Sequence, residues 1–464
     1  MVAHYSEQLA SYVVSQSYAK LPAQTVDHAK WLLLDAIGVS IAGADKKWAK
    51  AVLSEVRRQG GNPLSTIWLH GDKVSDVSAA LINGMFAHSM DFNDDHAGIQ
   101  AGGIMPTTAL AVAEATPGAT GQNVLESIVL GYDVAIRVAD AINSQQLYMR
   151  GFQPTAVCGG FAATAVAAKI MRLDKGALAD AFGIAGSYAG GTIEFLKEGT
   201  DTKRYHVAKA AHGGVLSARL AQAGMNGPRS IFEGEFGLFK VYSAEARPER
   251  LLAELGQRYD ILDTSVKLYP FCDGNAAPLE ATLQIMREHN VKLADIATLN
   301  YRIKSFLVPY MIDFHGDRTR KFRPQNELDA QMSLPYCMAV GLLNNGDLRV
   351  EDFDPVKYSD PKILEIADKC DAVADTELDK VPLRPMSMPS ICELTTKSGA
   401  KYMQRVDYQK GDPRNPFSQE DFIRKFKTCC EGRLGADKTA KIVDAVRTFD
   451  TCDDVRKFTA LLSA

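Results

Sequence analysis

Acidic side chains gather in one short window of this chain. Asp91, Asp94 and Asp95 stand close together, directly before His96 and a stretch rich in glycine and alanine. Grouped carboxylates can ligate a hard cation, transfer a proton or cap the end of a helix. A calcium loop needs spaced ligands and a terminal Glu, which this window lacks. The sequence therefore favours proton transfer or local capping over metal binding here.

A dense group of cations forms a second candidate for chemistry. Lys203, Arg204 and Lys209 follow a Gly-Thr turn, with His206 among them. Cations ahead of a helix of small residues can bind a carboxylate near the N-terminus of that helix. A lysine with neighbouring cations can also lose its proton near neutral pH and act as a base. A solvated, charged helix start is the alternative explanation.

Two turns complete the set of candidate segments. Each carries polar side chains just ahead of an expected helix: Tyr148, Arg150 and Gln153 in one, and Tyr269, Asp273 and Asn275 in the other. An ordinary helix-start turn explains either segment at least as well as a site does.

The elements that must position these segments are mostly helical in the first half of the chain. Residues 21–44 and 123–142 have apolar side chains at helical spacing. Residues 159–173 and 212–225 behave likewise, and 159–168 are nearly all small, which lets buried helices approach closely.

The pattern changes after about residue 266. Segments 298–306 and 391–408 alternate in the manner of strands, and the second is typical of a hairpin. Helical stretches at 277–288 and 327–344 lie between them, and helices resume after the turn "GDPRNP". We therefore predict a mainly α protein in which residues 1–265 and 400–464 form a large helical domain. Residues 266–399 would form a smaller, inserted α+β domain.

Composition excludes several classes of function. The 464 residues carry a net charge of −4 with no basic block, which argues against nucleic-acid binding. No apolar run is long enough to span a bilayer and no secretory signal is visible, so we expect no membrane association and a cytoplasmic location. The eight cysteines form no CxxC pair, which argues against disulfides and zinc. No GxGxxG, P-loop, HExxH or GxSxG motif is present.

In their order and spacing, these segments resemble the MmgE/PrpD family of 2-methylcitrate dehydratases, cis-aconitate decarboxylases and iminodisuccinate epimerases. "AHSMDFNDDH" is similar to the family's His-x-x-Asp-Phe-Asp-Asp element, and "TDTKRYHVAKAAHGGVLSA" to its Thr-Lys-x-x-His element. "KLYPFC" and "DAQMSLPYCMAVGLL" are similar to two further segments. The resemblance covers nearly the whole chain. It implies a large helical domain built from both chain ends, a smaller lid, a homodimer, no cofactor and an active site between the domains.

The family's chemistry removes a proton, a hydroxyl or a carboxylate from carbon next to a carboxylate. The resemblance places Asp91, Tyr148 and Lys203 at active-site positions. We expect Lys203 to act as the base or as the cation that stabilises an enolate, Tyr148 to donate a proton, and Asp91 to position or accept one. We expect the substrate-binding residues to be Asp94, Asp95, His96, Arg150, Gln153, Arg204, His206, Tyr269, Asp273 and Asn275, and we expect no metal.

Three histidines expected from the family are missing. No second His precedes Pro106, and Gln153 and Ala276 stand where the family has His. Asp95 stands where Thr or Ser is common, and Asp273 is an extra acid. Because imidazoles bind anions and move protons near neutrality, their loss indicates a substrate less anionic than citrate-like acids, or one with an amine or neutral polar group.

The sequence therefore predicts a cofactor-independent lyase, of the dehydratase or decarboxylase type, that abstracts a proton next to a carboxylate or carbonyl of a small organic acid. An epimerase or isomerase of a small carboxylic or amino acid is an alternative. A non-catalytic relative that binds a metabolite or protein partner is another, and it explains the lost histidines most simply. A metal-dependent hydratase that uses Asp94, Asp95 and His96 is the third.

Overall fold

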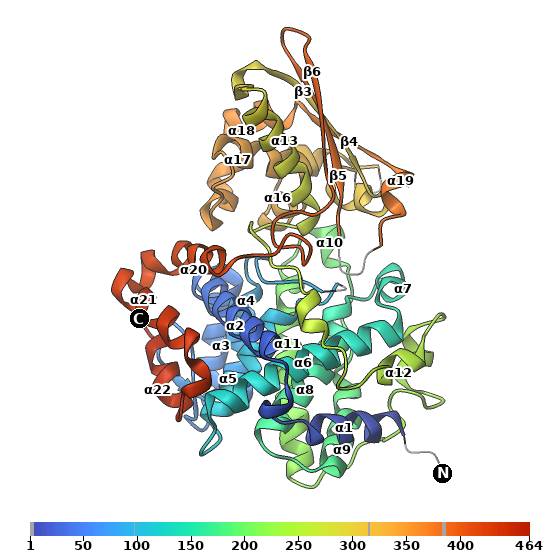
Figure 1. Ribbon diagram of the computed structural model, residues 1–464, viewed down its shortest axis with the longest axis vertical. Coiled ribbons are helices and arrows are strands. Elements are labelled where there is room, and N and C mark those ends of the chain that lie inside the picture. Colours follow the sequence, from blue (N-terminus) through green and yellow to red (C-terminus); the bar gives the residue numbers. More distant parts are fainter. Residues whose placement is uncertain (1–3, 97, 314–315, 383–386) are drawn as a thin grey trace.

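The structure is a computed structural model that describes residues 4–96, 98–313, 316–382 and 387–464. Figure 1 shows a larger helical part and a smaller part that carries a sheet, stacked along the long axis of the molecule. Each part has its own hydrophobic core. One core is built from residues between Leu9 and Val266 and between Phe422 and Leu462, and the other from residues between Tyr269 and Val406. Both chain ends thus share one core.

Helices make up the larger part. In chain order they are α1 (Tyr5–Ser15), α2 (Ala23–Gly43), α3 (Lys47–Gln59), α4 (Asp76–His88), α5 (Met105–Glu114), α6 (Gly121–Ile142), α7 (Ser144–Met149), α8 (Pro154–Ile170), α9 (Lys175–Ala185), α10 (Phe195–Glu198), α11 (Thr202–Gln222), α12 (Leu238–Tyr242), α20 (Gln419–Leu434), α21 (Ala436–Arg447) and α22 (Val455–Thr459). A short antiparallel pair, β1 (Ser65–Thr66) and β2 (Lys73–Val74), joins α3 to α4.

Small residues set the spacing at the centre of this part. Helix α11 packs against α8 and α4, and α6 packs against α8. A Cβ atom at Gly214 would lie 2.3 Å from the Cβ of Ala163, so only glycine allows α11 to lie this close to α8. The close approach expected from the small-residue run is confirmed. It matters for the site because α11 carries Lys203 in its first turn.

The smaller part is a four-stranded sheet covered by helices. Its strands are β3 (Ile296–Ile303), β4 (Cys370–Ala374), β5 (Ser390–Thr396) and β6 (Lys401–Val406), in the order β4-β3-β5-β6. Its helices are α13 (Ala276–Glu288), α14 (Val308–Met311), α15 (Thr319–Phe322), α16 (Glu327–Met332), α17 (Leu334–Leu343), α18 (Pro361–Ala367) and α19 (Thr376–Asp379). Helix α13 packs on β5 and β6, and α17 contacts β4.

The sheet agrees with the sequence pattern except at one strand. Buried Leu299, Tyr301 and Ile303 alternate with more exposed residues along β3, and β5 and β6 form the expected hairpin. Strand β4 pairs in parallel with β3 and was not expected, because it is a short segment that follows α18 directly. Since β6 runs to Val406, the sheet continues past residue 399, where the sequence suggested a return to the helical domain.

A buried ion pair ties the C-terminal helices to the loop that follows α4. Lys425 on α20 lies 2.7 Å from Asp35 on α2, and both side chains are 3% exposed. The Lys425 ammonium also donates to the backbone oxygen of Phe92 at 2.9 Å and lies 4.1 Å from the centre of that ring. Breaking one partner of such a pair leaves an uncompensated buried charge, so the loop at residues 91–95 is firmly held from this side.

Two further observations concern the chain as a whole. No helix in the described ranges is both long and apolar enough to cross a membrane. All eight cysteines are free thiols.

Candidate active site

Asp91 lies between two lysines that come from distant parts of the chain. Lys203 on α11 lies 2.5 Å from one carboxylate oxygen, and Lys267 lies 2.9 Å from the other. Lys267 also donates to the backbone oxygen of Asp91 at 3.0 Å. Asp91 adopts a φ of 51°, which is uncommon for a residue other than glycine and occurs where surrounding contacts enforce it. The three side chains therefore form one tightly held charged group.

The shared carboxylate pulls the pKa values in different directions. Burial alone would raise the pKa of Asp91, but the two lysines outweigh it and hold that pKa well below its usual range. For Lys203, burial outweighs Asp91 and the nearby charge of Lys267 adds to it, so its pKa is lowered. For Lys267, burial is outweighed by Asp91, Asp95 and Asp273, and its pKa is raised. Of the two lysines, Lys203 is the one that gives up its proton more readily.

Two more carboxyl groups face the same space. Asp95 accepts from the backbone N–H of Gly98 at 3.0 Å and from the side chain of Gln100, and burial raises its pKa to about 7. Asp273 accepts from the Gln409 side chain at 2.8 Å, and burial raises its pKa to about 6. Both groups change charge near neutral pH, so the charge of the site depends on pH across that range.

Tyrosines stand on a further wall of the site. The rings of Tyr148 on α7 and Tyr310 on α14 meet edge to face, with centroids 5.7 Å apart. Burial, helped by the neighbouring Tyr310, Cys272 and Asp91, raises the pKa of Tyr148 well above its ordinary value. Tyr148 therefore keeps its proton at neutral pH and can act as a proton donor.

These groups line one cavity of about 410 Å³ between the two parts of the molecule. Six residues expected from the sequence are among its lining: Asp91, Asp95, Tyr148, Gln153, Lys203 and Asp273. Apolar side chains such as Phe195, Leu307 and Met332 supply much of the remaining wall. Gln153 has a second task, since its side chain caps α8 by accepting from the backbone N–H of Ala156 at 3.3 Å.

Seven expected substrate-binding residues do not line this cavity: Asp94, His96, Arg150, Arg204, His206, Tyr269 and Asn275. His96 is buried, and Arg150 is exposed and reaches the backbone of Val241. Burial lowers the pKa of His206 to about 4, and its ring meets Phe195 edge to face.

Several of these seven side chains make contacts within the protein instead. Asp94 accepts from the Tyr132 hydroxyl and from the backbone N–H of Gly102, and burial raises its pKa to about 7. The rings of Tyr269 and Phe271 pack at a tilt, with centroids 5.1 Å apart. Arg204 is 2% exposed, donates to the backbone oxygen of Ser89 at 2.9 Å and lies 4.0 Å from the ring of Trp48. In these positions they hold the framework rather than face the cavity.

Sequence reasoning missed Lys267, which the structure places at the centre of the site. It stands only two residues before Tyr269, in the segment already singled out, but a lone lysine in a loop has no spacing that marks it. Lys267 is only 4% exposed, and it contacts a residue 176 positions away. Tyr310 and Cys272 also line the cavity and were not expected.

The side chains of Asp94, Asp95 and His96 do not converge on a common point. Asp94 faces Tyr132, whereas Asp95 faces Gln100. Among the residues that the structure describes, no three His, Cys, Asp or Glu side chains come together in a way that could hold a metal ion. The metal-dependent hydratase therefore has no ligand set in this segment.

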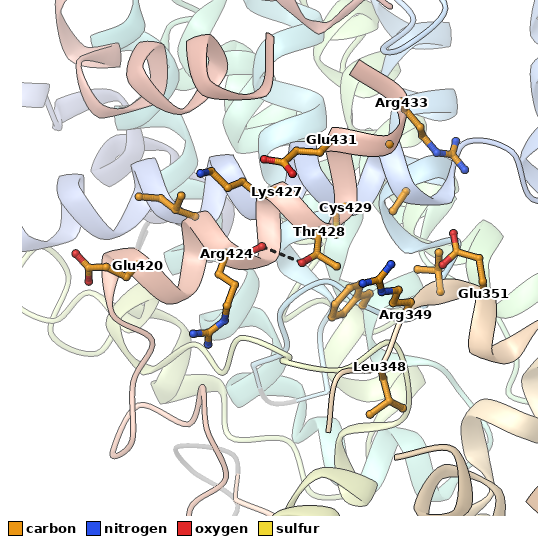
Figure 2. Close-up of a pocket in the computed structure, with 15 residues that line it drawn as sticks. Leu348, Arg349, Glu351, Glu420, Arg424, Lys427, Thr428, Cys429, Glu431 and Arg433 are labelled. Atoms are coloured by element: carbon orange, nitrogen blue, oxygen red, sulfur yellow. Dashed lines mark hydrogen bonds between the residues drawn. The ribbon is translucent and has the colours of Figure 1, made fainter. Parts of the chain in front are cut away.

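A larger hollow of about 720 Å³ lies elsewhere, between α20 and residues 348–351 (Figure 2). Its rim carries exposed charges of both signs, including Arg424, Lys427 and Glu431. It shares no lining residue with the cavity around Asp91, although Phe92 lines it. We take the Asp91 cavity as the candidate active site because it alone of the two holds the charged group described above.

Comparison with known proteins covers nearly the whole chain. Residues 7–251 match the MmgE/PrpD N-terminal domain, and residues 269–451 match the MmgE/PrpD C-terminal domain. Human cis-aconitate decarboxylase is 26% identical over 477 residues, which span 100% of this chain and 95% of the relative. A cis-aconitate decarboxylase-like protein, oryM, of Aspergillus oryzae is 24% identical over 472 residues, which span 98% of this chain and 96% of the relative. Cis-aconitate decarboxylase of Aspergillus terreus is 24% identical over 477 residues, which span 100% of this chain and 95% of the relative.

Proposed function

Because the chain belongs to the MmgE/PrpD family, we propose that it is a cofactor-independent lyase that abstracts a proton next to a carboxylate or carbonyl of a small organic acid. The observation that carries this proposal is Asp91 held between Lys203 and Lys267 inside a cavity. A carboxylate flanked by two buried amines, one of which has a lowered pKa, supplies both a base and a fixed positive charge.

The proposed roles follow from the pKa directions. Lys203 takes the proton from carbon, and the electron pair left behind moves onto the adjacent carboxylate or carbonyl oxygen. Lys267 stays protonated and stabilises the negative charge that develops there. Tyr148 donates its proton to the leaving group in an elimination, or to carbon in an epimerisation. Asp91 positions the Lys203 amine and the Lys267 ammonium group, whose nitrogens lie 2.5 and 2.9 Å from its oxygens.

We further propose that the substrate differs from cis-aconitate, on which the human relative is named to act. Asp95 and Asp273 face the cavity, where they offset the charge of the two lysines. A ligand with several carboxylates would meet this negative charge at neutral pH, whereas a ligand that carries an amine or a neutral polar group would not. An epimerase of a small amino acid remains the second candidate, because an amine on the substrate suits the same two carboxyl groups.

Ligand affinity is expected to depend on pH in a direction set by ligand charge. As pH rises from about 5.5 to about 8, Asp273 and Asp95 lose their protons, since their pKa values are about 6 and about 7. The cavity then becomes more negative, so succinate should bind more weakly. Aspartate carries one ammonium group more than succinate, so its affinity should rise relative to that of succinate. We expect the ratio of their affinities to change by about tenfold, which corresponds to about 1.4 kcal/mol.

Calorimetric titration of the two ligands at both pH values measures this ratio. The Asp95→Asn variant is the control, and the pH dependence should become shallower in it. Tight binding of citrate or cis-aconitate at pH 8 would contradict the proposed substrate class.

Proton abstraction itself is tested by exchange of carbon-bound hydrogen with solvent deuterium. Small acids that raise the melting temperature of the protein should lose the NMR signal of a hydrogen next to a carboxylate in deuterium oxide. We expect the exchange to be at least about tenfold faster than in buffer. Ligands that stabilise the protein but never exchange or turn over would instead support a non-catalytic binding protein.

A further inference from the structure

Gln331 lies at the junction of the three segments that build the site, although it does not line the cavity. It sits on α16 and is fully buried. Its side-chain oxygen accepts from the Arg204 guanidinium at 3.0 Å. Its side-chain nitrogen donates to the backbone oxygen of Met90 at 2.9 Å and to that of Pro270 at 3.2 Å.

Each of these partners is next to a residue of the site. Met90 precedes Asp91, and Arg204 follows Lys203. Pro270 lies in the segment that carries Lys267 and Asp273, and the backbone oxygen of Gln331 accepts from the N–H of Cys272 in that segment at 3.0 Å. Arg204 completes the connection by donating to the backbone oxygen of Ser89. One buried amide thus links the Asp91 loop, the first turn of α11 and the Lys267 segment.

The chemistry of the partners requires an amide here. Arginine only donates hydrogen bonds and the two backbone carbonyls only accept them. A side chain that joins all three must therefore accept at one end and donate at the other, which fixes the orientation of Gln331. Glutamate keeps the acceptor and loses both donors, and methionine loses all three hydrogen bonds.

We propose that Gln331 is a positioning residue that holds Asp91 at hydrogen-bond distance from Lys203 and Lys267, and thereby sets the proton affinity of Lys203. The role of Gln331 in catalysis rests on the proposed function. Its effect on Lys203 does not, because the reactivity of Lys203 can be measured without any substrate.

Competitive labelling of lysines with acetic anhydride, followed by mass spectrometry of the peptides, gives the pKa of Lys203 in the intact protein. In Gln331→Met the Asp91 loop loses one of its fixed points, so the carboxylate that raises the pKa of Lys203 is held less firmly. We expect the pKa of Lys203 to fall by at least about half a unit relative to the natural protein. Gln331→Leu, which also removes all three hydrogen bonds and adds no charge, should shift it in the same direction and serves if the methionine variant does not fold.

Asn83→Leu is the matched control. Asn83 is also a fully buried amide that accepts from one backbone group, the N–H of Trp68 at 3.0 Å, and donates to another, the oxygen of Thr66 at 3.0 Å. It does not line the cavity. Both variants should lower the melting temperature, but only the Gln331 variants should change the labelling of Lys203. An unchanged or raised pKa of Lys203 in both Gln331 variants would overturn the proposal.

Activity provides a separate readout once a substrate is found. Misplacement of reacting groups by about an ångström typically costs on the order of 10²-fold in rate, so kcat of Gln331→Met should fall by that order while KM changes little. If no small acid is turned over, the proposed function fails, and the labelling result still decides whether Gln331 positions the lysine.

Discussion

Replacing Lys203 by Met is expected to reduce turnover by about 10³-fold while leaving the protein folded. A general base in a fixed position contributes roughly 10²–10⁴-fold, and methionine fills the same space without an amine. The fold should survive because Asp91 keeps its ion pair with Lys267 at 2.9 Å. Steady-state kinetics on the substrate found by deuterium exchange measures the loss, and circular dichroism verifies the fold.

Lys209→Met is the control for this experiment. Lys209 lies on the same helix, is half-buried and donates to the backbone oxygen of Gly190 at 2.6 Å, but it does not line the cavity. Its variant should retain activity close to that of the natural protein. Retention of full activity in Lys203→Met would remove Lys203 from the mechanism.

Replacing Asp91 by Asn is expected to produce the second large effect, a loss of stability. Asparagine tolerates the positive φ of 51° at this position, so the backbone is not the cause of any loss. The two lysines lose the carboxylate that they share, and a buried charge without a partner destabilises a protein by about 3–5 kcal/mol. Activity should be lost as well, because the ammonium groups are no longer held in place.

The pH dependence of this variant identifies the cause. Without Asp91, Lys203 loses the carboxylate that raises its pKa, so burial and the charge of Lys267 hold that pKa further below the value of the unfolded chain. The unfolded state then binds more protons than the folded state. The free energy of unfolding should therefore rise between about pH 7 and about pH 9. Urea denaturation at both pH values measures this slope.

Two further variants complete the test. The double variant Asp91→Asn with Lys203→Met should recover part of the stability, since it removes one unpaired charge. Glu377→Gln, which breaks an exposed pair with Lys380, should change stability by less than about 0.5 kcal/mol. An Asp91→Asn protein as stable as the natural one would show that the lysines are not held as described.

The helices and the hairpin followed from sequence patterns because they depend on residues near one another in the chain. The spacing of apolar residues predicted α2 and α6, and the alternating pattern of residues 391–408 predicted the hairpin of β5 and β6. Strand β4 was not predicted from the sequence, because it pairs in parallel with a strand far away in the chain. The five residues of β4 contain no local signal of this pairing.

For the site too, local sequence predicted only part of the arrangement. Lys203 and Arg204 belong to one run of charges, but neighbours on a helix point about 100° apart. Lys203 therefore faces the cavity and Arg204 faces Ser89 and Gln331. Asp94 and Asp95 lie in the loop after α4 and also point apart, one toward Tyr132 and the other into the cavity. Charge density in the sequence located the segments, but only the packing of the folded chain decides which member of each cluster lines the cavity.

The buried pair of Lys425 with Asp35 has a consequence for the order in which the protein is made. Residues 1–265 contain every helix of the larger part except α20, α21 and α22. The contacts of the Asp91 loop with Lys267, Gln331 and Lys425 form later, in that order along the chain. Lys425 donates to the backbone oxygen of Phe92, next to Asp91. The lining residues of the cavity all lie at or before Met388, so a chain that ends before α20 contains every one of them but lacks the contact that Lys425 makes beside Asp91.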